Sequence, residues 1–159
     1  MDDKELFEKF LQKCYRFLSL RNRSEKEIRD YLKKKTAKYK LSEPKNIIDK
    51  VVTALKEEKL IDDKNFITWW VDQRSYFKPK GLFVLKQELL QKGINRDLID
   101  QYFEENKIDE LSLAKIALQK KVKVLKELKK EERYQKAISF LVRRGFSFET
   151  ANKVVRIIL

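Results

Sequence analysis

The sequence contains no histidine, one cysteine, three glycines and two prolines among its 159 residues. Without histidine, a serine or cysteine nucleophile has no imidazole base, and zinc lacks one of its ordinary ligands. Three scattered glycines cannot form a phosphate-cradling loop, and so few turn residues disfavour an all-β fold. We therefore expect an all-α protein that is not an enzyme and needs no metal and no cofactor.

The single cysteine, Cys14, cannot form an internal disulfide, which favours a reducing compartment. The first residues are acidic, unlike a signal peptide, and no uninterrupted apolar run is long enough to span a bilayer. These features predict a cytoplasmic protein.

Lysine and arginine outnumber aspartate and glutamate by 38 to 25, which gives a formal net charge of +13. Such a charge predicts attraction to a polyanion, either nucleic acid or an acidic protein surface, with an anionic membrane as a weaker candidate. The charge is uneven, because residues 1–60 carry +6, residues 61–110 carry −2 and residues 111–159 carry +9. We expect the two ends of the chain to attract the polyanion more than its middle.

Apolar residues recur at the three-four spacing of a helix face along most of the chain, in three sets of three helices. Cap residues and apolar stripes predict the first set of helices over residues 4–20, from Ser24, and after Ser42 and Pro44. The second set is predicted from Asp62, over 82–89 and from Asn95. The third set is predicted over Leu113–Leu128, over Glu132–Arg144 and from Ser147. In the helix from Asp62, Phe66, Trp70 and Phe77 fall on one face, which predicts a buried stripe.

Two of the sets share a plan, since Leu89–Ile94 aligns over Leu141–Phe146. In each, a glycine (Gly93 or Gly145) is expected in the left-handed position that ends a helix. We predict three tandem three-helix repeats over residues 1–60, 61–108 and 109–159, the first being divergent with an insertion near 36–44. Stacked repeats would form an elongated, curved body that buries its own apolar stripes, so we expect a monomer.

Three motifs in order resemble the RecX family of bacterial recombination regulators. They are Leu60–Phe66 followed by Trp70, Val71 and Arg74; Lys78–Gly81 followed by Leu85 and Glu88–Ile94; and Phe140–Phe148. The resemblance implies three tandem three-helix repeats and a partner, the RecA recombinase filament on single-stranded DNA. RecX-like proteins dock along that filament and inhibit its ATPase, strand-exchange and coprotease activities, which links them to DNA repair and the SOS response.

The predicted contact residues for RecA or DNA are basic side chains, some around the break between two predicted helices and some along the predicted basic helix over Leu113–Leu128. They are Arg74, Lys78, Lys80, Lys86, Lys92, Lys120, Lys121, Lys123, Arg143 and Arg144. Arg143 and Arg144 also suit a helix C-terminus for structural reasons alone, because cations are favoured by the helix dipole there. Trp69 and Trp70 could stack on exposed bases, but the periodicity assigns Trp70 to the core and leaves Trp69 open.

Two other functions fit parts of the sequence. A helix-turn-helix DNA-binding protein would need a basic or amide-rich recognition helix, whereas residues 95–106 carry four carboxylates beside a single arginine. A helical-repeat scaffold for an acidic protein partner, with no DNA involved, is also consistent with the net charge. The expected direct contact with single-stranded DNA is weak or made through the filament.

Overall fold

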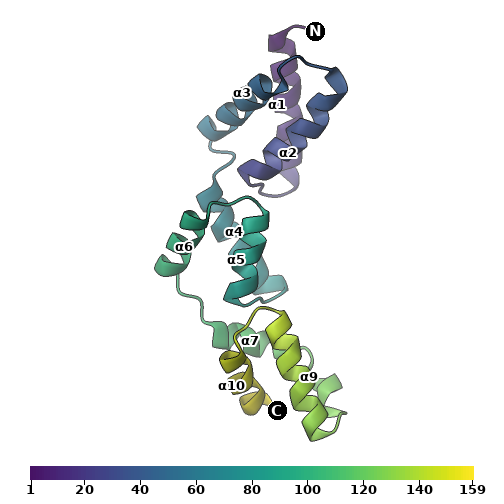
Figure 1. The fold of residues 1–159 in the computed structure, drawn as a ribbon, viewed down its shortest axis with the longest axis vertical. Coiled ribbons are helices and arrows are strands. Elements are labelled where there is room, and N and C mark those ends of the chain that lie inside the picture. The colour runs from purple at the N-terminus through teal and green to yellow at the C-terminus, as the bar shows by residue number, and fades with distance from the viewer. The chain divides into compact units, whose positions relative to one another are not determined.

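The computed structural model describes all residues, 1–159, and contains helices and no strands (Figure 1). The helices are α1 (Asp3–Leu20), α2 (Glu25–Thr36), the 3₁₀ turn η1 (Ala37–Tyr39), α3 (Pro44–Glu57), α4 (Asp63–Phe77), α5 (Leu82–Gln91), α6 (Arg96–Glu105), α7 (Glu110–Gln119), α8 (Val122–Lys126), α9 (Lys130–Arg143) and α10 (Phe148–Ile158). The prediction of an all-α fold of three-helix repeats is confirmed. None of the helices is both long and apolar enough to cross a lipid bilayer.

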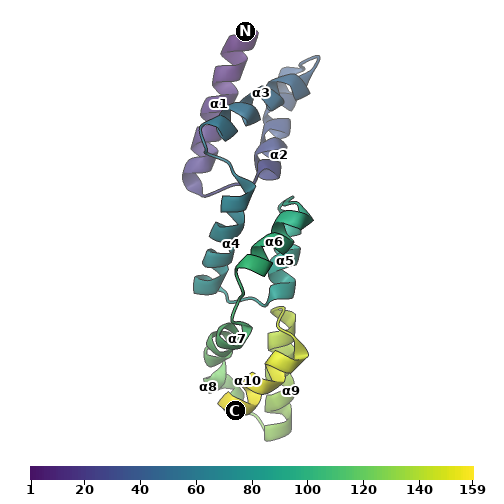
Figure 2. The ribbon, with the colours of Figure 1, turned by 90° about the vertical axis from the view of Figure 1, so that its left-hand side faces the viewer.

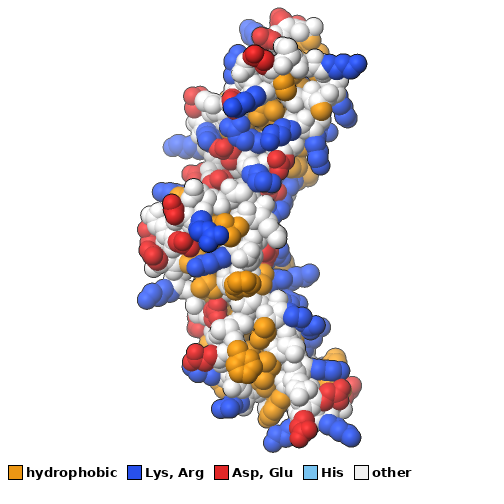
Figure 3. Space-filling view, in the orientation of Figure 1, with side chains coloured by type: hydrophobic (Ala, Val, Ile, Leu, Met, Phe, Trp, Pro, Cys, Tyr) orange, Lys and Arg blue, Asp and Glu red, His pale blue; other side chains and the backbone are white.

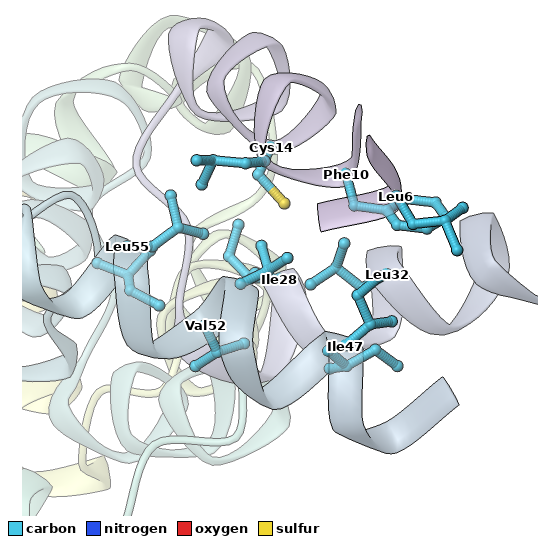
Figure 4. Close-up of a cluster of buried hydrophobic side chains, with 12 residues drawn as sticks. Leu6, Phe10, Cys14, Ile28, Leu32, Ile47, Val52 and Leu55 are labelled. Atoms are coloured by element: carbon cyan, nitrogen blue, oxygen red, sulfur yellow. The ribbon is translucent and has the colours of Figure 1, made fainter. Parts of the chain in front are cut away.

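By internal contacts the chain forms two compact units, the first made of Met1–Trp69 with Gln91–Asn95. Its core lies between α1, α2 and α3, where apolar side chains from all three helices meet (Figure 4). Phe10, Ile28, Leu32 and Leu55 are among its most buried members. Cys14 lies in the same core and is fully buried, as a small apolar residue would be.

The start of α2 is fixed by Ser24, as its sequence predicts. The Ser24 hydroxyl accepts a hydrogen bond from the amide of Glu27, and the carboxylate of Glu27 accepts one from the amide of Ser24. This capping box satisfies two amides that the helix itself leaves without partners. Pro44 occupies the first turn of α3, where its missing amide costs nothing.

The second unit consists of Trp70–Leu90 with Arg96–Leu159. Its main core lies between α7, α9 and α10, which are adjacent in Figure 2, and small residues such as Ala114 and Ala137 let the helices approach closely. Gly145 ends the α9 segment with φ = +94°, and Ser147 caps α10 by accepting from the amide of Thr150. Both the left-handed glycine and the cap were predicted, and both are confirmed.

The predicted single helix over Leu113–Leu128 is wrong. The chain turns after Gln119, where the amide of Lys121 donates to the carbonyl of Leu118 at 2.8 Å, and a short second helix, α8, follows. Because of the turn, Leu125 reaches the core with only 7% of its surface exposed. Burial of that leucine offsets the helical hydrogen bonds lost at the break.

The predicted burial of Phe77 is also wrong. Phe66, Ile67 and Val71 form the buried stripe of α4, but Phe77 in the last turn is 69% exposed. The helical spacing places Phe77 on the side of Phe66, yet most of the Phe77 side chain is left uncovered at the end of the helix. Periodicity predicts which face a residue occupies, but not how far along the helix the packing extends.

A joint inside the first unit connects the first repeat to the second. The Ser24 hydroxyl donates to the carbonyl of Lys92 at 2.7 Å, and the amide of Glu25 donates to the carboxylate of Asp63 at 3.0 Å. Gly93, at φ = +80°, lies directly against Lys26. The first residue of α4 thus caps α2, and the glycine turn before α6 packs beside that cap.

A joint inside the second unit repeats this arrangement one repeat later. The amide of Gly81 donates to the carbonyl of Arg144 at 2.8 Å, and the amide of Leu82 donates to the carboxylate of Glu110 at 2.8 Å. Gly145 lies against Val84. The first residue of α7 therefore caps α5, as Asp63 caps α2.

These joints explain why the chain divides into two contact units and not into one unit for each repeat. The Lys92–Gly93 turn belongs to the first unit, whereas the body of α5 and all of α6 belong to the second. The repeat boundaries predicted at residues 60/61 and 108/109 stay a prediction.

Candidate nucleic-acid interface

Arg74, near the end of α4, is held in place by Glu88 of α5. Its Nε donates to the Glu88 carboxylate at 2.8 Å and a terminal nitrogen lies 2.6 Å from the same oxygen. The guanidinium also lies over the ring of Trp70, 4.7 Å from its centre. The Glu88 side chain is only 16% exposed, so this ion pair is shielded from water and fixes the direction of Arg74.

Lys80 lies beside this ion pair in the connection between α4 and α5, and it is half-buried. Burial lowers its pKa; Glu88 raises it, but the positive charges of Arg144, Arg74 and Lys78 lower it further. The net shift is downward. We call Arg74, Lys78, Lys80 and Arg144 the corner cluster. Its four positive charges outnumber the nearby carboxylates of Glu88 and Glu110, so the corner cluster favours an anion.

Arg144 joins the corner cluster because of the second joint. Its carbonyl accepts from Gly81, which brings the end of α9 against the start of α5. Its guanidinium lies 5.0 Å from the ring centre of Phe140. A residue more than sixty positions away in sequence thus adds its charge to the corner.

A groove between α8 and α9 is lined in part by Phe140. It has a volume of about 490 Å³ and is lined by Lys121, Val124, Leu125, Gln135, Lys136, Ser139, Phe140 and Arg143. Lys121 places its ammonium 5.7 Å from the centre of the Phe140 ring. Three cations around an apolar floor suit a ligand that is both anionic and apolar.

The structure brings together six of the ten predicted contact residues, in these two groups. Four others lie elsewhere. Lys86 is directed to α6, with its ammonium 3.8 Å from Asp100 and 5.8 Å from the ring centre of Phe103. Lys92 belongs to the first joint, where it pairs with Glu27 at 3.6 Å, while Lys120 and Lys123 are exposed beside the turn that ends α7.

Three exposed aromatic residues near the corner cluster were not predicted as contact residues. Tyr76 is 80% exposed, Phe77 69% and Phe83 68%. The available signal was their position around Lys78–Gly81, since rings interleaved with lysines are typical of nucleic-acid contacts. Lys136 and Phe140 were also missed, although their spacing of four residues places them on one face of α9.

The two tryptophans differ in environment from such exposed rings. Trp69 is half-buried, 5.7 Å from the ring of Phe66, with the guanidinium of Arg21 over it at 5.8 Å. Trp70 is half-buried beneath Arg74. Both rings therefore pack against the protein's own side chains.

Family models match the chain in three places. Residues 11–36 match the first three-helix domain of RecX, residues 62–102 the second and residues 108–155 the third. Together the three matches cover more than half of the chain, in the order in which the domains are numbered.

Curated relatives and solved structures agree with these matches. The chain is 34% identical over 139 residues to "Regulatory protein RecX" of Streptococcus mutans, and 33% identical over 150 residues to that of Listeria monocytogenes. These alignments cover 85% and 92% of this chain but 50% and 53% of the relatives, so the chain spans about half the length of the curated relatives it matches.

Two solved structures share the fold. The crystal structure of RecX from Lactobacillus salivarius matches with a TM-score of 0.74 and 21% identity, over 96% of each chain. A crystal structure of regulatory protein RecX matches with a TM-score of 0.72 and 23% identity, over 97% of this chain and 77% of the other.

Proposed function

Because the chain belongs to the RecX family, we propose that it binds the filament of the RecA recombinase on single-stranded DNA and inhibits that filament's activities. The activities concerned are ATP hydrolysis, strand exchange and coprotease stimulation, and the role is that of a cytoplasmic modulator of recombination and DNA repair. The observation that carries the proposal is the ordered match to three RecX domains.

The contact surface proposed for this role combines the corner cluster and the α8–α9 groove. The corner cluster supplies cations for phosphates of the filament's DNA, and the groove supplies cations around an apolar floor for the protein. Inhibition follows if the protein binds one conformation of the filament more tightly than the others, because binding then shifts the filament toward that conformation.

The test is the rate of ATP hydrolysis by RecA on single-stranded DNA, measured with increasing amounts of this protein. We expect the rate to fall at substoichiometric to equal ratios. An unchanged rate at concentrations where the protein sediments with the filament contradicts the proposal.

A charge variant locates the contact surface. Lys78→Gln with Lys121→Gln removes two exposed cations, one from each group, without touching either core. We expect the concentration for half-inhibition to rise roughly threefold to tenfold, since exposed charge contacts contribute up to about 1 kcal/mol each. Lys153→Gln with Arg156→Gln, on exposed positions of α10, removes the same charge and serves as the control.

An acidic protein partner without DNA is a second candidate, and the α8–α9 groove favours it. In that case the Lys121→Gln change alone would weaken the partner's binding by up to about fivefold, and single-stranded DNA would not compete. A helix-turn-helix function has less support, because α6 exposes Asp97, Asp100 and Glu104 where a recognition helix needs donors.

A further inference from the structure

Three large aromatic side chains are exposed around the connection between α4 and α5. Tyr76 and Phe77 end α4, and Phe83 lies in the first turn of α5, all with more than two thirds of their surface in contact with solvent. Figure 3 shows hydrophobic side chains at the end of α5 that joins α4, with lysine and arginine side chains to one side. Three such rings within eight residues are unusual at a surface that contacts only water.

The cations beside these rings belong to the corner cluster. Lys78 and Lys80 stand between Phe77 and Phe83 in the chain, and Lys80 is crowded by the charges of Arg74 and Arg144. Of the two carboxylates near them, Glu88 is already paired with Arg74 and Glu110 accepts from the amide of Leu82. The surface therefore offers flat apolar faces and unmatched positive charge together, which is how proteins hold single-stranded nucleic acid.

The connection that carries the rings is firmly positioned. Pro79 is buried, the amide of Gly81 is bonded to Arg144, and the amide of Leu82 is bonded to Glu110. The backbone between the two helices thus has contacts on both sides of Lys80. A ligand that binds the rings therefore does not have to order this backbone.

We propose that Tyr76, Phe77 and Phe83 form a stacking platform for the bases of a single-stranded nucleic acid, whose phosphates contact Lys78, Lys80 and Arg144. A duplex is a poorer ligand, because its bases are already stacked on one another and only its phosphates are available. The proposal rests on the proposed function only in that the strand would be the DNA of the RecA filament. Direct binding of a free strand requires only the platform.

The first test uses the unaltered protein and two ligands. Fluorescence anisotropy measures the affinity of the protein for a labelled oligothymidylate of about 20 nucleotides and for an abasic oligonucleotide of the same length. The abasic strand has the same phosphates and no bases. We expect the abasic strand to bind at least tenfold more weakly, because base stacking on aromatic side chains contributes about tenfold per base. Equal affinity for the two strands overturns the proposal.

The second test uses a stacking variant, Tyr76→Ser, Phe77→Ser and Phe83→Ser together. We expect its affinity for oligothymidylate to fall by about tenfold per ring removed, while the slope of log affinity against log salt concentration is unchanged. Phe148→Ser, which removes an equally exposed ring from α10, is the control and keeps wild-type affinity. Circular dichroism verifies that each variant is folded.

A phosphate variant, Lys78→Gln with Lys80→Gln, gives the opposite pattern. Its salt slope should decrease by about 0.7 for each phosphate that the variant no longer neutralises, while its preference for thymidylate over the abasic strand remains. Wild-type affinity of the stacking variant, or tighter binding of duplex than of single strand, overturns the proposal. If the protein binds the oligonucleotide as expected but does not change ATP hydrolysis by RecA, only the proposed function is contradicted. If it inhibits RecA but the stacking variant binds the oligonucleotide like the wild type, only the platform is contradicted.

Discussion

Glu27 in the first turn of α2 holds more partners than most acidic side chains of the protein. Its carboxylate accepts from Arg21 and from the amide of Ser24, and the ammonium of Lys92 lies 3.6 Å away. Burial opposes its charge, but the hydrogen bonds from Arg21 and Ser24 and the charges of Arg21 and Lys92 outweigh burial, so the pKa of Glu27 is lowered from its ordinary 4.5. The carboxylate thus stabilises both the start of α2 and the first joint.

Replacing Glu27 by glutamine should lower the free energy of unfolding by about 1–3 kcal/mol at pH 7, because a charged hydrogen-bond network loses its charge. Since the folded-state pKa lies below the unfolded value, this contribution is present above pH 4.5 and is lost as pH falls through the folded-state pKa. Urea titrations of the wild type and variant at pH 7 and at pH 3 measure the difference.

The Glu27→Gln prediction has a matched control in Glu57→Gln, an exposed position on α3. That variant should stay within about 0.5 kcal/mol of the wild type at both pH values. A deficit in Glu27→Gln that is equally large at pH 3 would contradict the electrostatic explanation.

At the scale of the helices, the position of α5 depends on Gly81. This glycine has no left-handed backbone angle, but a Cβ built on it would lie 2.1 Å from the carbonyl oxygen of Gly145. The obstacle is backbone, which cannot rotate away as a side chain can. Gly81 is therefore required by the close approach of two turns, whereas Gly93 and Gly145 are also required by their positive φ angles.

We expect Gly81→Ala to destabilise the second unit by about 1–3 kcal/mol, since the extra methyl group forces the joint apart. Chemical denaturation monitored by circular dichroism measures the loss. Gln87→Ala, on the exposed side of α5, serves as the control and should show little change. An unchanged denaturation midpoint for Gly81→Ala would contradict the prediction, because the joint would then accommodate the methyl group without loss of stability.

At the scale of the whole molecule, each compact unit has its own core. The first is built around residues such as Phe10 and Leu55, and the second around residues such as Leu141 and Val154, with no buried residue in common between the two clusters. Burial raises the pKa of the Cys14 thiol to about 12, so the thiol is neutral and inaccessible while the first unit is folded. Its reaction with a thiol reagent reports opening of that unit alone.

We expect Leu141→Ala to destabilise the second unit by about 2–5 kcal/mol, through reduced burial and a cavity. In a Trp69→Phe background, the fluorescence of Trp70 reports the second unit, and its urea midpoint should fall. The midpoint for Cys14 labelling should not move. If both midpoints fall together, the two units unfold as one cooperative body.

Much of the fold could be predicted from the sequence because its causes are local. The Ser24 capping box, the Ser147 cap and the left-handed glycines at 93 and 145 each depend on a few neighbouring residues. Three motifs in order were enough to indicate the family, and the family matches confirm it. The composition likewise determined the helical class and predicted the attraction to a polyanion.

What the tertiary structure decided depends on partners far away in the sequence. Periodicity could not show that Phe77, at the end of α4, is left exposed. It also could not show that a turn after Gln119 places Leu125 in the core. Nor could spacing show that Arg144 lies near Lys80 while Lys86 is directed to Asp100. Whether a basic side chain is free at the surface or paired within a joint depends on which carboxylates and carbonyls lie near it. Only the packing of the helices determines those neighbours.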